Sequence, residues 1–286
     1  MSDTAPISLS ASRAAPATAL RPRNLGEMVL SVAARQRGVA LRYRRDGDLI
    51  TVSYPEFGAQ ISEVGRGLIA LGIEPGDRVA IFATTSADWT VADFGILCAG
   101  GVVTPVYHTN SAQECEYVLA HSGARAVFCG DAEQAQKVAQ IRDRCPDLEH
   151  VIAFAPGVPG TIDLDALRLR GAAIAREMIS DRLAARARDD LATIVYTSGT
   201  TGPPKGCLLT HGNMLETARM YAEELNIGEQ HVLYSFLPLA HVLARVAQMT
   251  LISVGGGVTF WSGDMGRIAQ ELAELEPTHF PAVPRV

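Results

Sequence analysis

The stretch that most constrains this chain covers residues 193–206 and reads TIVYTSGTTGPPKG. Its first three residues are a β-branched, mostly apolar run typical of a buried strand. The glycines that follow allow positive φ angles and a close approach of the backbone to a ligand. Successive backbone N–H groups in such a loop can bind an anion, and Lys205 adds a point charge on a long side chain. The stretch therefore predicts a strand that leads into a phosphate-binding loop.

Two other glycine-rich loops are excluded by residues that this stretch lacks. The Walker loop needs the pattern G-x-x-x-x-G-K-[ST], whereas position 204 is Pro and position 206 is Gly. A nucleophile elbow, G-x-S-x-G around Ser198, needs glycines where this chain has Tyr196 and Thr200. A solvated Gly/Thr loop remains as the alternative, but the order strand, hydroxyl-glycine loop, lysine and helix favours phosphate binding.

Strand-like and helix-like segments alternate through most of the chain. The expected strands cover residues 78–83, 102–106, 126–129, 150–154, 231–237, 258–261 and 278–283. The expected helices cover residues 24–36, 55–72, 87–99, 111–121, 132–144, 210–225, 242–254 and 265–275. Such alternation predicts an α/β fold with two parallel-type sheets that carry helices on both faces. Asp46-Gly47 predicts a hairpin turn between two earlier strands.

Composition divides the chain into three parts. Residues 1–23 are rich in Ala, Ser and Pro and are expected to form a disordered tail. Residues 24–190 are expected to form a first α/β subdomain with an N-terminal hairpin and a linker, because glycines and prolines interrupt residues 155–190. Residues 191–286 are expected to form a second α/β subdomain, which contains the phosphate loop and ends before its fold is complete.

Charge and cysteine content exclude several classes of function. The 286 residues carry a net charge of −6, so the composition gives no indication of nucleic-acid binding. The five cysteines are scattered without a C-x-x-C pair, which argues against a disulfide framework or a zinc site and favours a reducing cytoplasm. The most apolar stretch, residues 94–107, is too short to span a membrane and contains Pro105. The N-terminus lacks the continuous apolar run of a signal peptide.

Two motifs resemble a known family. Residues 196–206, YTSGTTGPPKG, resemble the phosphate-binding signature of the AMP-forming adenylating superfamily, which includes acyl-CoA synthetases. Residues 235–245, SFLPLAHVLAR, most resemble the long-chain acyl-CoA synthetase branch. A weaker resemblance extends from Leu25 to the last residue. It implies the N-terminal domain of an acyl-CoA synthetase-like fold, and it implies that this chain is a fragment of such a protein that is not expected to be competent alone.

The resemblance also implies a reaction. A fatty acid carboxylate attacks ATP to give acyl-AMP and pyrophosphate, and coenzyme A then displaces AMP; Mg²⁺ arrives with ATP. The residues that carry over as the cradle for the β- and γ-phosphates are Thr197, Ser198, Gly199, Thr200, Thr201, Gly202 and Lys205. By the same resemblance, Thr197 touches the Mg²⁺ ion bound to ATP. Lys205 and His241 are the expected catalytic residues.

The second motif leaves two residues open. His241 is expected near the acyl pocket, where it would position the reacting carboxylate; the alternative is a histidine satisfied locally at a helix start. Arg245 follows one turn later on the same face, either as a surface cation or as part of the site. Some long-chain enzymes place a tryptophan gate near this point, whereas this chain has Leu243, Ala244 and Arg245. A gated acyl tunnel is therefore not expected.

The leading hypothesis is the N-terminal part of an ATP-dependent, AMP-forming long-chain fatty acid-CoA ligase that acts on small molecules and not on nucleic acid. The alternatives are an acyl-AMP ligase or other carboxylate-adenylating enzyme, and a non-catalytic, truncated nucleotide-binding product. A serine hydrolase using Ser198 and His241 lacks both the elbow and an assignable acid. An apolar substrate is compatible with peripheral membrane contact, although no basic amphipathic helix indicates it. The sequence leaves the oligomeric state open.

Overall fold

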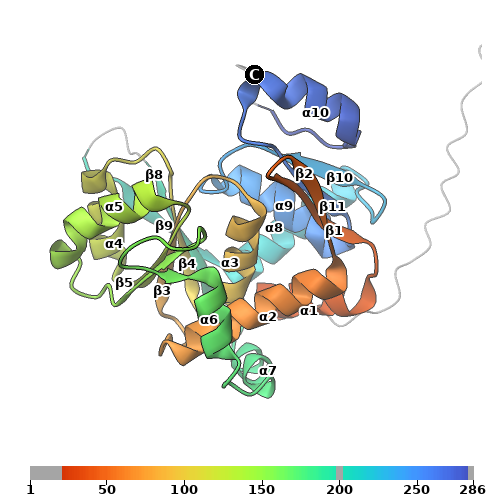
Figure 1. Cartoon of the computed structure of the whole chain (residues 1–286). Helices are drawn as coiled ribbons and strands as arrows, with labels where there is room; N and C mark the ends of the chain where they lie inside the picture. The colour runs from red at the N-terminus through yellow and green to blue at the C-terminus, as the bar shows by residue number, and fades with distance from the viewer. Residues whose placement is uncertain (1–20, 198–201, 283–286) are drawn as a thin grey trace, which may run out of the picture.

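The computed structural model describes residues 21–197 and 202–282, which form two β-sheets surrounded by helices (Figure 1). The larger sheet has the strand order β7-β6-β5-β3-β4-β8-β9, and the smaller has the order β10-β11-β1-β2. The larger sheet consists of β3 (Arg78–Phe82), β4 (Val102–Val106), β5 (Ala124–Cys129), β6 (His150–Ala153), β7 (Ile162–Asp163), β8 (Leu191–Thr197) and β9 (Lys205–Thr210). The smaller sheet consists of β1 (Val39–Arg45), β2 (Asp48–Ser53), β10 (Val232–Ser235) and β11 (Gly257–Phe260). The predicted α/β class with two sheets is confirmed.

Helices connect most of these strands. They are α1 (Leu25–Arg35), α2 (Tyr54–Ala70), α3 (Ala87–Cys98), α4 (Ala112–Ser122), α5 (Ala132–Ile141), α6 (Leu164–Gly171), α7 (Glu177–Ala184), α8 (His211–Glu224), α9 (Val242–Val254) and α10 (Ile268–Leu275), with short 3₁₀ helices at Arg142–Arg144 and Met265–Arg267. Within the described residues, no helix is both long enough and apolar enough to cross a bilayer.

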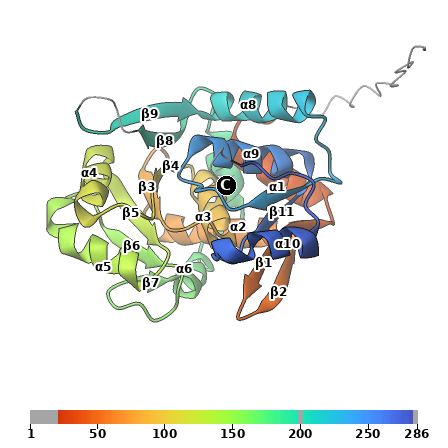
Figure 2. The same ribbon diagram turned by 90° about the horizontal axis from the view of Figure 1, so that it is seen from above.

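The larger sheet carries an apolar core on each face, because successive side chains of a strand point to opposite sides. In β3, Val79 and Ile81 belong to the core that contains α2 and α3, whereas Ala80 and Phe82 belong to the core that contains α4 and α5. Helix α3 lies between the two sheets, and every residue in it except Asp88 is buried (Figure 2). The helices on both faces are therefore as predicted.

Each sheet ends in one antiparallel pair. The β1–β2 hairpin turns at Asp46 and Gly47, both with positive φ, as the sequence predicts. Strand β9 pairs antiparallel with β8, and the sequence analysis expected no strand between the loop and the helix over residues 210–225. The connection between β8 and β9 is too short for a crossover to a parallel strand, which needs about a dozen residues. Each of the two sheets, expected to be of parallel type, is therefore mixed, with one antiparallel strand at one edge.

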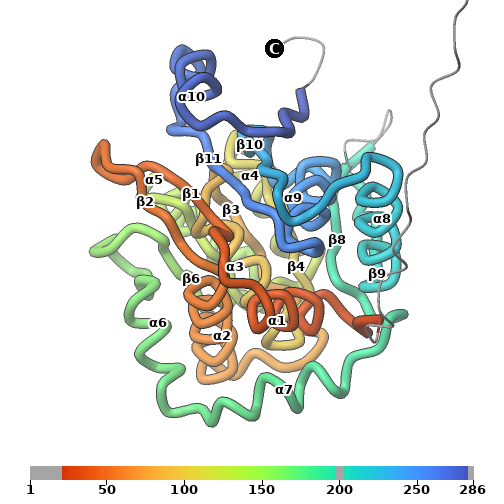
Figure 3. Tube along the Cα trace, turned by 90° about the vertical axis from the view of Figure 1, so that its right-hand side faces the viewer, coloured from red at the N-terminus to blue at the C-terminus, as the bar shows by residue number. Residues whose placement is uncertain are grey.

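The two sheets do not divide the chain at residue 190. The β1–β2 hairpin belongs to the predicted first subdomain, yet it pairs through β1 with β11 of the second. Conversely, β8 and β9 complete the sheet built by the first subdomain. The predicted linker contains α6 and α7, which pack along α2 (Figure 3). Strand pairing between distant segments decides this arrangement, and a composition-based boundary does not detect it.

Two helices approach closely at glycines. The pattern Gly65-x-Gly67-x-x-Ala70 imitates a dinucleotide-binding fingerprint, but it lies inside α2. A Cβ atom added to Gly67 would lie 2.5 Å from the carbonyl oxygen of Leu167 in α6. One added to Gly171 would lie 2.5 Å from the backbone nitrogen of Gly67. These glycines therefore serve helix packing and not nucleotide binding.

We expect Gly67→Ala to lower the free energy of unfolding by about 1–3 kcal/mol, because backbone must move to admit the methyl group. In an unobstructed helix the same change would stabilise by about 1 kcal/mol. Gly38→Ala is the control, since an added Cβ there meets nothing within 4 Å. Urea unfolding of the three proteins measures the difference. An unchanged or raised stability for Gly67→Ala would contradict the tight crossing of α2 and α6.

Side chains cap the first turns of several helices, at residues where the sequence pattern places the helix starts. The side chain of Asn24 accepts a hydrogen bond from the amide of Glu27 at the start of α1, and Ser111 and Glu114 form a capping box at α4. Thr210 caps α8 through the amide of Asn213.

The next residue, His211, is buried, and its Nδ1 accepts a hydrogen bond from the amide of Leu25 at 3.3 Å. Burial and the nearby Arg186 lower the pKa of His211 to about 4.

This histidine makes stability depend on pH. The folded state holds His211 neutral with a pKa of about 4, whereas the unfolded chain has the ordinary value of 6.5. Its contribution is fully present above pH 6.5 and is lost as the pH falls toward 4. Between pH 7.5 and pH 5.0 we expect His211 to account for about 2 kcal/mol of lost stability. Urea unfolding at both pH values should show a smaller loss for His211→Gln; an equal loss would contradict this assignment.

Candidate functional site

The predicted phosphate loop connects β8 to β9 as the turn of a hairpin. Thr197, the last residue of β8, pairs with Lys205, the first residue of β9, and both are exposed. Gly202 adopts a φ of 85°, the left-handed conformation that the glycine-rich sequence anticipated. The remaining predicted cradle residues lie outside the described residues; they are Ser198, Gly199, Thr200 and Thr201.

The two exposed residues share one face of the hairpin. Directly paired residues of antiparallel strands point to the same side, so the hydroxyl of Thr197 and the ammonium of Lys205 project together. Lys205 forms no ion pair with any residue that the structure describes. An ammonium group beside a hydroxyl can neutralise the charge of a polyphosphate and donate hydrogen bonds to it. The hydroxyl oxygen is also the kind of ligand that Mg²⁺ prefers.

The opposite face of β8 packs on α4. Tyr196 accepts or donates a 2.8 Å hydrogen bond between its hydroxyl and Nδ1 of His121. Burial raises the pKa of Tyr196, and the neighbouring Tyr117 adds to the effect. The hydroxyl of Tyr117 donates a 2.9 Å hydrogen bond to the carbonyl of Pro204, immediately before Lys205. Helix α4 therefore contacts both β8, at Tyr196, and the residue that immediately precedes β9, at Pro204.

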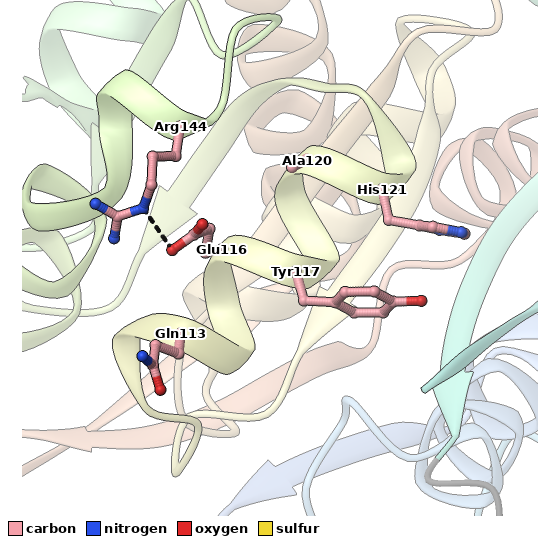
Figure 4. Close-up of a pocket in the computed structure, with 6 residues that line it drawn as sticks. All are labelled: Gln113, Glu116, Tyr117, Ala120, His121 and Arg144. Carbon is pink, nitrogen blue, oxygen red and sulfur yellow. Dashed lines mark ion pairs between the residues drawn. The ribbon is translucent and has the colours of Figure 1, made fainter. Parts of the chain in front are cut away.

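An open depression lies on the same helix (Figure 4). Tyr117 and His121 stack with ring centroids 5.2 Å apart and point to the same side of α4. Arg144 pairs with Glu116 at 2.8 Å across the depression. The remaining lining residues are Gln113 and Ala120. Sequence reasoning did not select these residues, although the predicted helix and its i, i+4 spacing place Tyr117 and His121 on one face.

His241 lies at the N-cap of α9 and is exposed. Its Nδ1 accepts a hydrogen bond from the amide of Leu243 at 3.3 Å. His241 is thus satisfied locally at the start of the helix, which is the alternative that the sequence left open. The exposed ring is compatible with contact to a substrate as well. The positioning role of His241 remains a prediction.

Arg245 differs from both roles considered for it. It is neither a surface cation nor exposed to a ligand, because its side chain is 0% exposed. Its guanidinium donates to both carboxylate oxygens of Asp93 in α3, at 2.6 and 3.3 Å, and lies 5.6 Å from the ring centre of Trp89. Burial raises the pKa of Asp93, an effect that the guanidinium opposes. Arg245 follows His241 by one helical turn, as the spacing predicts, but the Arg245 side chain is buried whereas His241 is exposed.

Arg245 also reaches β8. Its Nη1 donates a 2.7 Å hydrogen bond to Oγ1 of Thr193, which lies on the same face of the strand as Thr197. Sequence reasoning missed Asp93 and Thr193 as partners, since 152 and 52 residues separate them from Arg245. Nothing in the local sequence indicates that Arg245 is buried while His241, one helical turn earlier, is exposed. Among the described residues, no group of three or more His, Cys, Asp or Glu side chains is arranged to hold a metal.

Comparison with known proteins agrees with the motifs. A family model described as AMP-binding enzyme matches residues 30–286. Long-chain-fatty-acid–CoA ligase FadD15 of Mycobacterium tuberculosis is 40% identical over 245 residues, which cover 84% of this chain and 40% of that protein. Long-chain-fatty-acid–CoA ligase ACSBG2 of Xenopus laevis is 31% identical over 259 residues, covering 87% of this chain and 35% of that protein. The chain thus spans less than half the length of these relatives.

Solved structures share the fold. The N-terminal domain of FACL13 from Mycobacterium tuberculosis superposes with a TM-score of 0.78 at 25% identity, covering 92% of this chain and 63% of that one. A long-chain-fatty-acid-CoA ligase (FadD1) from Archaeoglobus fulgidus gives a TM-score of 0.80 at 17% identity, covering 94% of this chain and 53% of that one. These likenesses confirm the predicted N-terminal-domain fold of an acyl-CoA ligase.

Proposed function

The chain belongs to the family of AMP-binding enzymes, and on this premise we propose that its β8–β9 hairpin binds the phosphates of ATP during activation of a long-chain fatty acid. The observation that carries the proposal is the pairing of Thr197 with Lys205, both exposed on one face at the ends of the loop. The names of the relatives supply the substrate class. Because the chain covers 40% of the first relative, the activity of the complete relatives is part of the proposal.

The proposed first step joins two anions. A carboxylate oxygen attacks the α-phosphorus of ATP, and the bond from that phosphorus to the bridging oxygen breaks, which releases pyrophosphate. No protein nucleophile is needed, so the protein contributes by screening charge and by orienting the reactants. Lys205 would neutralise charge on the β- and γ-phosphates, and the hydroxyl of Thr197 would face them or their Mg²⁺ ion.

The proposed second step releases AMP. The thiol of coenzyme A attacks the acyl carbon, loses its proton, and displaces AMP to leave a thioester. We assign His241 a positioning role near the carboxylate, because its exposed ring stands at the start of α9. Ser198, Gly199, Thr200 and Thr201 retain their proposed contacts with phosphate.

Binding of ATP can be tested without turnover, because the sequence contains two lysines, Lys137 and Lys205. Limited acetylation with and without Mg²⁺-ATP, read by peptide mass spectrometry, reports on both in one sample. ATP at ten times its Kd should slow modification of Lys205 by about tenfold. Lys137, paired with Glu133 on α5, is the internal control. Equal modification of Lys205 with and without ATP would contradict the proposed phosphate site.

Palmitate-dependent exchange of pyrophosphate into ATP tests the chemical step. Exchange together with a coenzyme A thioester supports a CoA ligase, whereas exchange without thioester favours an acyl-AMP ligase. Protection of Lys205 without exchange favours the alternative of a nucleotide-binding chain that does not adenylate. Exchange driven equally by short carboxylates would contradict the long-chain substrate.

A further inference from the structure

A buried polar network joins three elements that are distant in sequence. Asp93 in α3, Thr193 in β8 and Arg245 in α9 are all 0% exposed. Arg245 donates to Asp93 at 2.6 and 3.3 Å and to Thr193 at 2.7 Å. Burying an ion pair is costly even when it is well paired, so stability alone is a weak reason for its presence. The location of the network suggests another role.

Thr193 lies where β8 pairs with its parallel neighbour β4. Among the described residues, the register between β4 and β8 is defined at one pair, Val103 with Thr193. At that pair the hydroxyl of Thr193 donates a 2.7 Å hydrogen bond to the carbonyl of Val103 and accepts one from Arg245. One hydroxyl thus fastens β8 to β4 on one side and to α9 on the other.

Both segments that carry the proposed site residues meet at this hydroxyl. Thr197 lies four residues after Thr193 on the same face of β8 and pairs with Lys205. His241 caps α9, and its carbonyl accepts a hydrogen bond from the amide of Arg245. The contact between Arg245 and Thr193 therefore links the hairpin directly to the first turn of α9.

We propose that the Asp93–Arg245–Thr193 network is a positioning device that holds the phosphate-loop hairpin in a fixed relation to the N-terminus of α9. Asp93 fixes the plane of the guanidinium by accepting from two of its nitrogens, and this leaves Nη1 directed at Thr193. None of the three residues touches a substrate. The inference rests on the proposed function for its consequence in ATP binding, but the attachment of β8 can be tested separately.

Thr193→Val is the informative change, because it keeps the shape of the side chain and removes the hydroxyl. Thr193→Ser restores the hydroxyl. Thr90→Val is a matched control: the buried hydroxyl of Thr90 in α3 donates a 2.8 Å hydrogen bond to Gln248 in α9. The control therefore removes a buried contact between α3 and α9 without touching β8.

Hydrogen exchange of backbone amides, measured on the whole chain, separates positioning from general stabilisation. In Thr193→Val we expect the amides of β8 and β9 to exchange at least tenfold faster relative to those of β3 and β5, because the variant loses both hydrogen bonds of a buried hydroxyl. Thr193→Ser should restore the wild-type ratio, and Thr90→Val should leave it unchanged. A uniform increase across the sheet, or the same local increase in Thr90→Val, would overturn the proposal.

Protection of Lys205 by ATP supplies the functional readout. We expect Thr193→Val to need about tenfold more ATP for half-protection, and Thr90→Val to resemble the wild type. If the wild type shows no protection, the proposed ATP site fails while hydrogen exchange still decides the attachment of β8. If ATP protects all the variants equally, the network does not position the site and the inference is wrong.

Discussion

Replacing Lys205 by alanine is expected to lower any palmitate-dependent ATP–pyrophosphate exchange that the chain catalyses by about 10²–10³-fold, the usual effect of removing one preorganised donor from a charge-stabilising site. Lys205 is exposed, forms no ion pair with a described residue, and pairs with Thr197 beside the loop. In the proposed function, its ammonium would neutralise charge on the pyrophosphate leaving group. The apparent KM for ATP should rise as well, because the same charge acts on bound ATP.

The chain offers a matched control for this change. Lys137→Ala removes the other lysine, which pairs with Glu133 one helical turn away on α5. Its exchange rate should equal that of the wild type. Lys205→Arg keeps the charge but alters the geometry of the donors, so an intermediate rate is expected. An exchange rate in Lys205→Ala within about twofold of the wild type would remove Lys205 from the mechanism, since it is far below the loss of one such donor.

Arg245→Met is expected to lower the free energy of unfolding by about 3–5 kcal/mol, because it leaves the carboxylate of Asp93 buried without its partner. The cost exceeds that of a lost surface ion pair, since neither side chain is exposed to water. Met approximates the length of the arginine stem and keeps the contact with Trp89. Urea unfolding at pH 7.5 measures the change, and an unaltered m-value shows that the compared states are the same.

The double variant Asp93→Leu/Arg245→Met distinguishes lost charge pairing from lost packing. Replacing both partners of a buried ion pair by apolar residues is often neutral, so the double variant should be more stable than Arg245→Met alone. The Thr193 hydroxyl still loses its donor, and the hydrogen exchange of β8 should therefore remain fast. If the double variant loses as much stability as Asp93→Leu and Arg245→Met lose together, the charge pair is not the source of the destabilisation in Arg245→Met.

Local features of the fold were predictable because their causes are local. Helix caps at Asn24, Ser111 and Thr210 follow from side chains that accept from amides three residues away. The hairpin at Asp46-Gly47 follows from residues that tolerate positive φ. Strand β9 was missed because its sequence, Lys205 to Thr210, has no regular alternation of buried residues, as expected of an edge strand with half-exposed side chains.

For the proposed site, the sequence by itself determined the family and the phosphate-loop motif that contains Thr197 and Lys205, since a continuous stretch encodes this motif. Only the tertiary structure decided that Thr197 pairs with Lys205 across a hairpin and that Arg245 is buried with Asp93 and Thr193. The physical reason is distance along the chain. Buried charges must find partners wherever the fold brings them, and no local pattern specifies a partner 152 residues away.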